Sequence, residues 1–188
     1  MEKFKNKYTI KSARLQGYDY SQNGMYFITI CTKDREHFFG EIKNEAMILF
    51  DIGKIANEFW QEIPKHFPFV KLDEFIVMPN HVHGIIEICN ESNACRDEAL
   101  PRLYTGRYPK MSEISPRPKS LSVIIGSFKS IVSKIVNKKS SNIYFHWQSR
   151  FYDNIIRDDE SLNKIREYIK INPKMWEQDR NNLENINM

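Results

Sequence analysis

The amino-acid sequence predicts an α+β fold, a ferredoxin-like sandwich with an antiparallel sheet, helices on one face and a C-terminal helix carrying a tyrosine. The first reason is the order of the predicted elements: strand, helix, strand, strand, loop, helix, strand, helix. The second is that two runs rich in β-branched residues are separated only by Pro79-Asn80, which indicates adjacent strands around a turn. The third is size, because 188 residues with 41% hydrophobic and 28% charged residues suit one domain, 1–188, with a real core.

The first half of the chain contains a basic arm followed by a strand, a helix and two more strands. The arm ends near residue 22. In the predicted helix, Asp51 is a plausible cap and the apolar residues repeat at helical spacing. The predicted ranges are 1–22 for the arm, 25–32 for the first strand, 50–66 for the helix, and 69–78 and 81–89 for the two strands.

The second half begins with residues 90–119, which contain four prolines and no periodic apolar pattern. We expect a long, mobile, basic loop there. Helical spacing returns after it, and the last helix is preceded by three acids that suit a helix N-terminus and is followed by Pro173. The predicted ranges are 120–139 for a helix, 143–148 and 151–156 for short extended segments, and 161–172 for the last helix.

Two histidines stand in the second of the adjacent strands. Strand alternation places His81, His83 and Glu87 on one face, and Gly84 on the other, where it lets another backbone approach closely. Two imidazoles on one face can converge on one metal ion, and Glu87 could accept a hydrogen bond that orients one of them. The simpler interpretation is a pair of half-buried histidines beside a turn, with Glu87 an ordinary charged residue near a strand end.

Charge and cysteine content narrow the class of protein. The net charge is +4, and residues 101–150 hold ten lysines and arginines against the single acid Glu113. Such segregation is typical of proteins that bind a polyanion, although a solvated basic surface has the same pattern. Three scattered cysteines favour a reducing, cytoplasmic setting. No apolar run approaches the ~20 residues of a membrane helix, and the N-terminus lacks the apolar core of a signal peptide.

Most of the chain resembles the single-tyrosine HUH transposases, and in particular the REP-associated tyrosine transposases. The resemblance excludes the 90–119 loop and the C-terminal end. Its most specific elements are a His-hydrophobe-His pair and Tyr-x-x-x-Asn-Pro. It runs through Arg14-Leu-Gln-Gly-Tyr-Asp-Tyr20, Tyr26–Arg35, Phe39-Gly-Glu-Ile42, Val77-Met-Pro-Asn-His-Val-His-Gly84, Ser127-Phe-Lys129, Trp147-Gln148, Tyr152–Arg157 and Ile165–Pro173.

The resemblance implies specific roles for four residues. His81 and His83 would be metal ligands, Tyr168 the nucleophile, and Asn172 a further ligand that completes the metal site. Mixed nitrogen and oxygen ligands favour Mg²⁺ or Mn²⁺, with Zn²⁺ and Ni²⁺ as alternatives. Considered singly, Tyr168 also fits a tyrosine at the edge of the core, and Asn172 a routine residue at a helix end.

The implied activity is metal-dependent nicking and strand transfer of single-stranded DNA that carries a hairpin, through a 5′-phosphotyrosine. A domesticated protein that binds hairpins without cutting them, and a metal-dependent phosphohydrolase that uses water, are the alternatives. A monomer and a homodimer are both compatible with the sequence, and a cytoplasmic protein of this kind would associate with the nucleoid when bound to DNA. The residues expected to contact DNA are Arg14, Tyr18, Tyr20, Lys119, Lys129, Lys134, Trp147 and Arg150.

Overall fold

The computed structural model describes residues 15, 18–90, 117–139, 144–179 and 181–182. Its centre is a four-stranded sheet in which every neighbouring pair is antiparallel and the order is β4-β5-β1-β6. The strands are β1 (Gly24–Cys31), β4 (Val70–Met78), β5 (His81–Ile88) and β6 (Tyr152–Ile156). The predicted strands therefore form, and β5 and β1 occupy the centre of the sheet.

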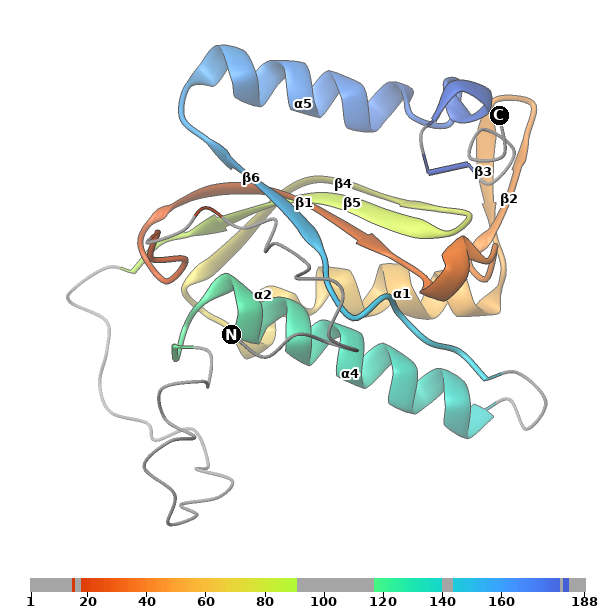
Figure 1. Ribbon diagram of the computed structural model, residues 1–188, viewed down its shortest axis with the longest axis horizontal. Helices are drawn as coiled ribbons and strands as arrows, with labels where there is room; N and C mark the ends of the chain where they lie inside the picture. The colour runs from red at the N-terminus through yellow and green to blue at the C-terminus, as the bar shows by residue number, and fades with distance from the viewer. Residues whose placement is uncertain (1–14, 16–17, 91–116, 140–143, 180, 183–188) are drawn as a thin grey trace, which may run out of the picture.

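Helices lie on both sides of this sheet (Figure 1). On one side are α1 (Asp51–Gln61), α2 (Ile63–His66) and α4 (Leu121–Lys139), and on the other is α5 (Asp159–Ile171). This arrangement confirms the predicted α+β class, with the C-terminal helix separate from the helical layer. Among the described residues, no helix has both the length and the apolar character needed to cross a bilayer.

The large core lies between the sheet and α1 and α4, and strand alternation explains which side chains enter it. Along β5, Val82, Ile86 and Ile88 point into this core and are fully buried. Gly84 lies between them, and a Cβ at this position would overlap the indole of Trp60. The close neighbour that the glycine admits is therefore an aromatic ring, where we had expected a backbone.

Four local features differ from the sequence predictions. The helix predicted over 50–66 is interrupted at Glu62 and becomes α1 and α2. Asp51 is not its cap, because Phe50 takes that position and Asp51 instead pairs with Lys54. A hairpin of β2 (Gly40–Lys43) and β3 (Ala46–Leu49) was not predicted, since strands of four residues are too short for a clear period. Two 3₁₀ turns, η1 (Lys33–Arg35) and η2 (Trp176–Gln178), were also not predicted.

A smaller cluster attaches α5 to the opposite face of the sheet. Leu162 and Ile169 of α5 pack against Ile85 of β5. The helix starts at Asp159, two residues before the predicted start, and the Asp158 side chain caps it by accepting a hydrogen bond of 2.7 Å from Ser161 N. The face that carries His81 and His83 is therefore the face that α5 covers.

Candidate metal and tyrosine site

The two histidines lie side by side on the α5 side of the sheet. Both are 0% exposed, and their ring centroids are 4.4 Å apart. In the register of β5 with β1, His81 lies opposite Cys31 and His83 opposite Thr29, so residues of the central strand frame both rings. The structure thus brings the two imidazoles together as strand alternation predicted.

The proton position on His81 follows from its neighbour Asn80. Asn80 Nδ2 donates to two backbone oxygens, Arg35 O at 2.9 Å and Asn181 O at 2.8 Å, which fixes the orientation of the amide. Asn80 Oδ1 then lies 2.8 Å from His81 Nδ1 and must accept a hydrogen bond from it. His81 therefore carries its proton on Nδ1, and the lone pair of Nε2 could bind a metal ion.

His83 connects the sheet to α5. Its Nδ1 lies 2.9 Å from Thr29 Oγ1, and its ring stacks on Phe27 with a centroid distance of 5.2 Å. The other ring nitrogen, Nε2, is 3.2 Å from the hydroxyl oxygen of Tyr168. The phenol thus lies next to a histidine atom that is suited to bind a metal ion.

Asp179 is a third group of this site, and it was not among the residues predicted from the sequence. It is 7% exposed and lies just after η2, and one of its carboxylate oxygens, Oδ2, is 4.0 Å from His81 Nε2. Ligand atoms of His81, His83 and Asp179 all lie within 4.8 Å of one another. The other carboxylate oxygen accepts a hydrogen bond of 2.6 Å from Asn181 N, which holds the carboxylate in place. The only sequence signal was an acid a few residues beyond Pro173, in a stretch with no periodic pattern.

Asn172 is buried at the C-terminal end of α5. It is 1% exposed, and its Oδ1 accepts no hydrogen bond from any described residue. A buried amide oxygen without a donor normally costs free energy, and a cation would remove that cost. The group of two imidazoles and the Asp179 carboxylate is one that could hold a divalent metal ion, and the Asn172 oxygen is a buried acceptor that could bind a cation.

Two ion pairs between β4 and α5 fix the rotation of α5 about its own axis. Asp73 receives two hydrogen bonds from Arg166, at 2.8 and 2.5 Å, and Glu74 pairs with Lys170 at 3.0 Å. Adjacent strand residues normally point to opposite faces, but a register shift between Leu72 and Phe75 lets Asp73 and Glu74 both reach the helix. The Arg166 guanidinium holds the pKa of Asp73 below its ordinary value.

This contact, which we name the α5 clamp and define as Asp73–Arg166 with Glu74–Lys170, also directs the tyrosine. At 100° per residue, Arg166 and Lys170 share one flank of the helix, and Tyr168, two residues from each, lies on the other. A rotation of α5 would therefore move the phenol away from His83. The clamp fixes that rotation from the flank that does not carry the tyrosine.

The position expected for Glu87 is taken by other residues. The Nδ1 atoms of the two imidazoles meet Asn80 Oδ1 and Thr29 Oγ1. Glu87 lies four residues beyond His83 on β5, about 13 Å along the strand, and pairs with Met25 in the ladder. The orienting role that the sequence analysis considered for it thus belongs to Asn80 and Thr29.

Two of the aromatic residues expected to contact DNA are in the core. Tyr20 is 8% exposed and contacts Tyr18 and Tyr26, and Trp147 is 9% exposed and donates from Nε1 to Lys129 O at 3.1 Å. Neither ring can stack on a base without leaving the core. An aromatic residue between polar residues has no period that reveals its burial, so the sequence alone did not distinguish these two core residues from exposed ones.

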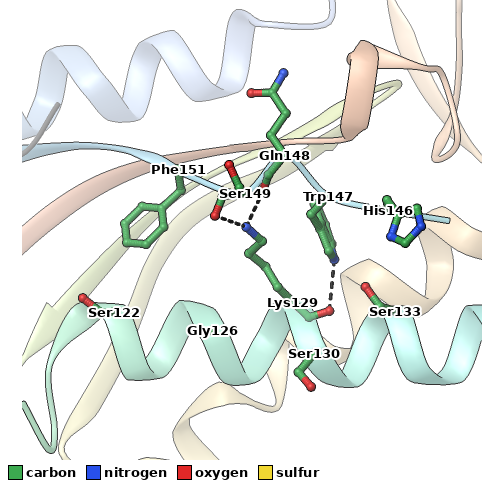
Figure 2. Close-up of a pocket in the computed structure, with 10 residues that line it drawn as sticks. All are labelled: Ser122, Gly126, Lys129, Ser130, Ser133, His146, Trp147, Gln148, Ser149 and Phe151. Atoms are coloured by element: carbon green, nitrogen blue, oxygen red, sulfur yellow. Dashed lines mark hydrogen bonds between the residues drawn. The ribbon is translucent and has the colours of Figure 1, made fainter. Parts of the chain in front are cut away.

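The expected cationic residues divide into exposed ones and one half-buried one. Lys119, Lys134 and Arg150 are exposed, whereas Arg14 lies outside the described residues, as do most of the basic arm and the 90–119 loop. Lys129 is half-buried, and desolvation lowers its pKa. Its ammonium donates to Gln148 O at 2.5 Å and to Ser149 O at 3.3 Å, and so ties the 146–151 segment to α4 (Figure 2).

Lys129 also lines a groove of about 430 Å³ between α4 and the 146–151 segment (Figure 2). We name it the α4 groove. Among the described residues, nothing lies within 4 Å of where a Cβ of Gly126 would be, so no packing contact requires a glycine there. A glycine inside a helix costs roughly 0.5–1 kcal/mol relative to alanine. The residues that line the groove are Ser122, Gly126, Lys129, Ser130, Ser133, His146, Trp147, Gln148, Ser149 and Phe151.

Comparison with known proteins identifies two sequence relatives. No protein-family model matches it. An uncharacterized protein of Haemophilus influenzae is 41% identical over 176 residues, covering 90% of this chain and 91% of that protein. A second protein of the same organism, provisionally named a REP-associated tyrosine transposase, is 26% identical over 160 residues, covering 82% of this chain and 73% of that protein.

The fold has a matching solved structure, described as a REP-associated tyrosine transposase bound to a REP hairpin. The TM-score is 0.54 at 15% sequence identity, and the match covers 87% of this chain and 73% of that chain. An identity this low supports the fold alone, and the sequence likeness to the Haemophilus influenzae proteins supplies the relationship. In sequence and in fold, the chain therefore resembles the REP-associated tyrosine transposases, as its sequence motifs indicated.

Proposed function

We propose that the protein nicks single-stranded DNA and transfers the strand through a 5′-phosphotyrosine at Tyr168, in a metal-dependent reaction on hairpin-bearing repeats. The observation that carries the proposal is the 3.2 Å distance between the Tyr168 hydroxyl and His83 Nε2, within a buried group of metal-binding side chains. A surface tyrosine would have no reason to adjoin such a group. The solved relative with a REP hairpin supports the choice of substrate.

Three side chains, His81, His83 and Asp179, would hold the divalent ion, and the Asn172 oxygen would complete the set. When bound, the ion would polarise the scissile phosphate and draw charge from its oxygens. Asn80 keeps the Nε2 lone pair of His81 directed at the site, and Thr29 restrains the His83 ring. The ligand set favours Mg²⁺ or Mn²⁺.

Tyr168 supplies the nucleophile. Its hydroxyl loses a proton to solvent, the phenolic oxygen forms a bond to phosphorus, and the bond from phosphorus to the 3′ oxygen breaks. The departing oxygen takes up a proton and becomes a free 3′-hydroxyl. Because the phosphotyrosine conserves the phosphodiester energy, a 3′-hydroxyl of another strand can reverse the step without a nucleotide cofactor.

The α5 clamp limits where this attack can occur. It holds the phenol against His83 within one chain, so a single subunit contains every described group of the site. A monomer is therefore sufficient for the first cleavage in the proposed reaction. Whether two copies associate for strand transfer, and whether the protein acts in the cytoplasm, stay predictions from the sequence.

The proposal is tested by looking for a covalent adduct between the protein and its DNA substrate. The full chain is incubated with Mn²⁺ and a hairpin-bearing single strand from the repeats that flank its gene, labelled at the 3′ end because that fragment stays on the protein. Wild-type protein should form an adduct that resists denaturation, and Tyr168→Phe should form none. Tyr152→Phe is the matched control, since Tyr152 is exposed and lies beside Thr29 on the same face of the sheet.

The alternatives predict different results. An adduct that survives Tyr168→Phe would refute the assigned nucleophile. Cleavage without any adduct would indicate that water is the nucleophile, and tight binding without cleavage would indicate a protein that only holds hairpins.

A further inference from the structure

We propose that the α4 groove holds the sugar–phosphate backbone of the DNA substrate, as a second contact region on the other side of the sheet from Tyr168. The inference rests on the proposed function, because it takes DNA as the substrate. It concerns a separate surface, because α4 and α5 cover opposite sides of the sheet (Figure 1). The groove, of about 430 Å³, is lined by residues of α4 and of the 146–151 segment.

The lining of the groove suits phosphate oxygens, which only accept hydrogen bonds. Ser122, Ser130 and Ser133 of α4 are among the lining residues. The Lys129 side chain extends from α4 to the 146–151 segment (Figure 2). His146 and Gln148 of that segment also line the groove. Hydroxyls, amides and an ammonium are the groups that proteins use to contact the DNA backbone without reading its sequence.

The charge of the two lining segments favours an anion. Residues 117–139 and 144–152 contain no aspartate or glutamate, and they carry seven lysines and arginines: Arg117, Lys119, Lys129, Lys134, Lys138, Lys139 and Arg150. The next carboxyl along the chain is Asp153, on β6 beyond the groove. The α5 helix is different, because Asp159, Glu160 and Glu167 balance its three basic residues, Lys164, Arg166 and Lys170. A polyanion is therefore attracted first to the α4 side.

The glycine at position 126 favours the close approach of a ligand to the backbone of α4. The glycine weakens the helix, and among the described residues none fills the space beside it. That space opens into the groove. A close approach of a ligand to the helix backbone accounts for a residue that packing within the chain does not require.

Tyr144 provides a place for an unpaired base at the end of the groove. It is 78% exposed, and its ring centroid lies 4.1 Å from that of His146, which lines the groove. An exposed aromatic ring next to a polar, cationic channel is the usual arrangement for binding a single strand. Tyr144, and not the buried Trp147, is therefore the aromatic residue of this segment that can stack on a base.

The test compares two serines of α4 that are three residues apart. Ser130 lines the groove and Ser127 does not, and both are exposed. Ser130→Glu and Ser127→Glu introduce the same charge on the same helix, and neither removes the Lys129 contacts. Binding of a hairpin-bearing strand and of unstructured oligothymidine is measured without metal, so that no cleavage occurs, and thermal unfolding shows that both variants fold.

We expect Ser130→Glu to weaken DNA binding about tenfold more than Ser127→Glu, because a carboxylate in the groove repels the backbone directly. Weakening of hairpin binding alone would assign the groove to the stem, and weakening of both would assign it to a single strand. Equal effects of the two substitutions would overturn the proposal. Tyr144→Ala should weaken oligothymidine binding while Tyr144→Phe does not.

The rate of adduct formation at saturating DNA separates this proposal from the proposed function. Ser127→Glu should leave that rate unchanged, because Ser127 lines neither the groove nor the site around Tyr168. A protein that binds DNA through the groove but forms no adduct would refute the proposed chemistry and retain the groove. If the adduct forms but Ser130→Glu and Ser127→Glu bind DNA equally well, the proposed chemistry is retained and the groove is refuted.

Discussion

The two faces of the sheet use polar residues in opposite ways. On the α5 face, His81, His83 and Asp179 are buried, and neighbouring side chains fix their orientation. On the α4 face, serines and a lysine line an open groove. Buried, converging groups are suited to one defined reaction, whereas an open row of donors is suited to holding a backbone in many sequences. Substitutions on the first face should change rates and metal affinity, and those on the second should change DNA affinity.

The largest effect should come from removing a metal ligand. Asp179→Asn keeps the shape of the side chain but removes its charge, and we expect Mn²⁺ affinity to fall by about 100-fold or more. Calorimetric titration of Mn²⁺ measures it, with Asn172→Ala as the comparison, because that residue was the ligand predicted from sequence. Wild-type Mn²⁺ affinity in Asp179→Asn would show that the carboxylate does not bind the ion.

The next effect concerns the α5 clamp. Arg166→Gln should slow adduct formation about 100-fold, because a shift of about 1 Å in the nucleophile costs that much. Lys164→Gln is the matched control, since Lys164 is on the same helix and pairs with Glu160. The double variant Asp73→Arg with Arg166→Asp should recover part of the rate. If Arg166→Gln reacts at the wild-type rate with saturating DNA, the clamp does not position Tyr168.

The pKa of Asp73 gives the clamp a pH dependence. Because Arg166 lowers this pKa in the folded protein, the ion pair contributes its full stability above the unfolded pKa of about 3.9 and loses it as the pH falls through the lowered folded value. The free energy of unfolding of wild type should therefore exceed that of Asp73→Asn at neutral pH. The two curves should converge in acid, and a difference that persists there would have another cause.

A smaller effect is expected at the residue that restrains His83. Thr29→Val has nearly the same shape but leaves Nδ1 of His83 without the hydroxyl, and we expect Mn²⁺ affinity to fall about 10–100-fold. Thr29→Ser retains the hydroxyl and should bind Mn²⁺ nearly as well as wild type. Equal Mn²⁺ affinity in the valine and serine variants would exclude an orienting role for Thr29.

The smallest effect is on the α4 face and has the opposite sign for stability. Gly126→Ala should raise the free energy of unfolding by roughly 0.5–1 kcal/mol, because alanine favours a helix and nothing described fills that space. The bulkier Gly126→Leu should weaken DNA binding, while Ser127→Leu should not. A decrease in stability for Gly126→Ala would indicate a packing role for the glycine instead.

Much of this fold was predictable because its elements have clear periods. The alternation of β5 placed both histidines on one face, and the apolar residues of α4 and α5 gave their helices to within a few residues. The resemblance pointed to Tyr168 and Asn172, and the structure places Tyr168 beside His83 and buries Asn172 at the end of the same helix. Their roles in a reaction stay predictions.

Asp179, Asn80 and Thr29 were not predictable, because their importance depends on contacts between distant segments. Asp179 reaches His81 only because the chain turns back after α5, and no local pattern encodes that turn. Asn80 looked like a turn residue, yet its amide bridges Arg35 and Asn181. Tyr20 and Trp147 illustrate the reverse error, because aromatic residues in irregular segments were expected to contact DNA and are buried.

The measurement that tests the central claim most directly is the mass of the peptide that carries the nucleotide after reaction. The adduct is digested with protease and nuclease, and the modified residue is located by fragmentation. We predict a nucleotide on the phenolic oxygen of Tyr168. A nucleotide on another residue such as Tyr152, or cleaved DNA with every peptide unmodified, would contradict it.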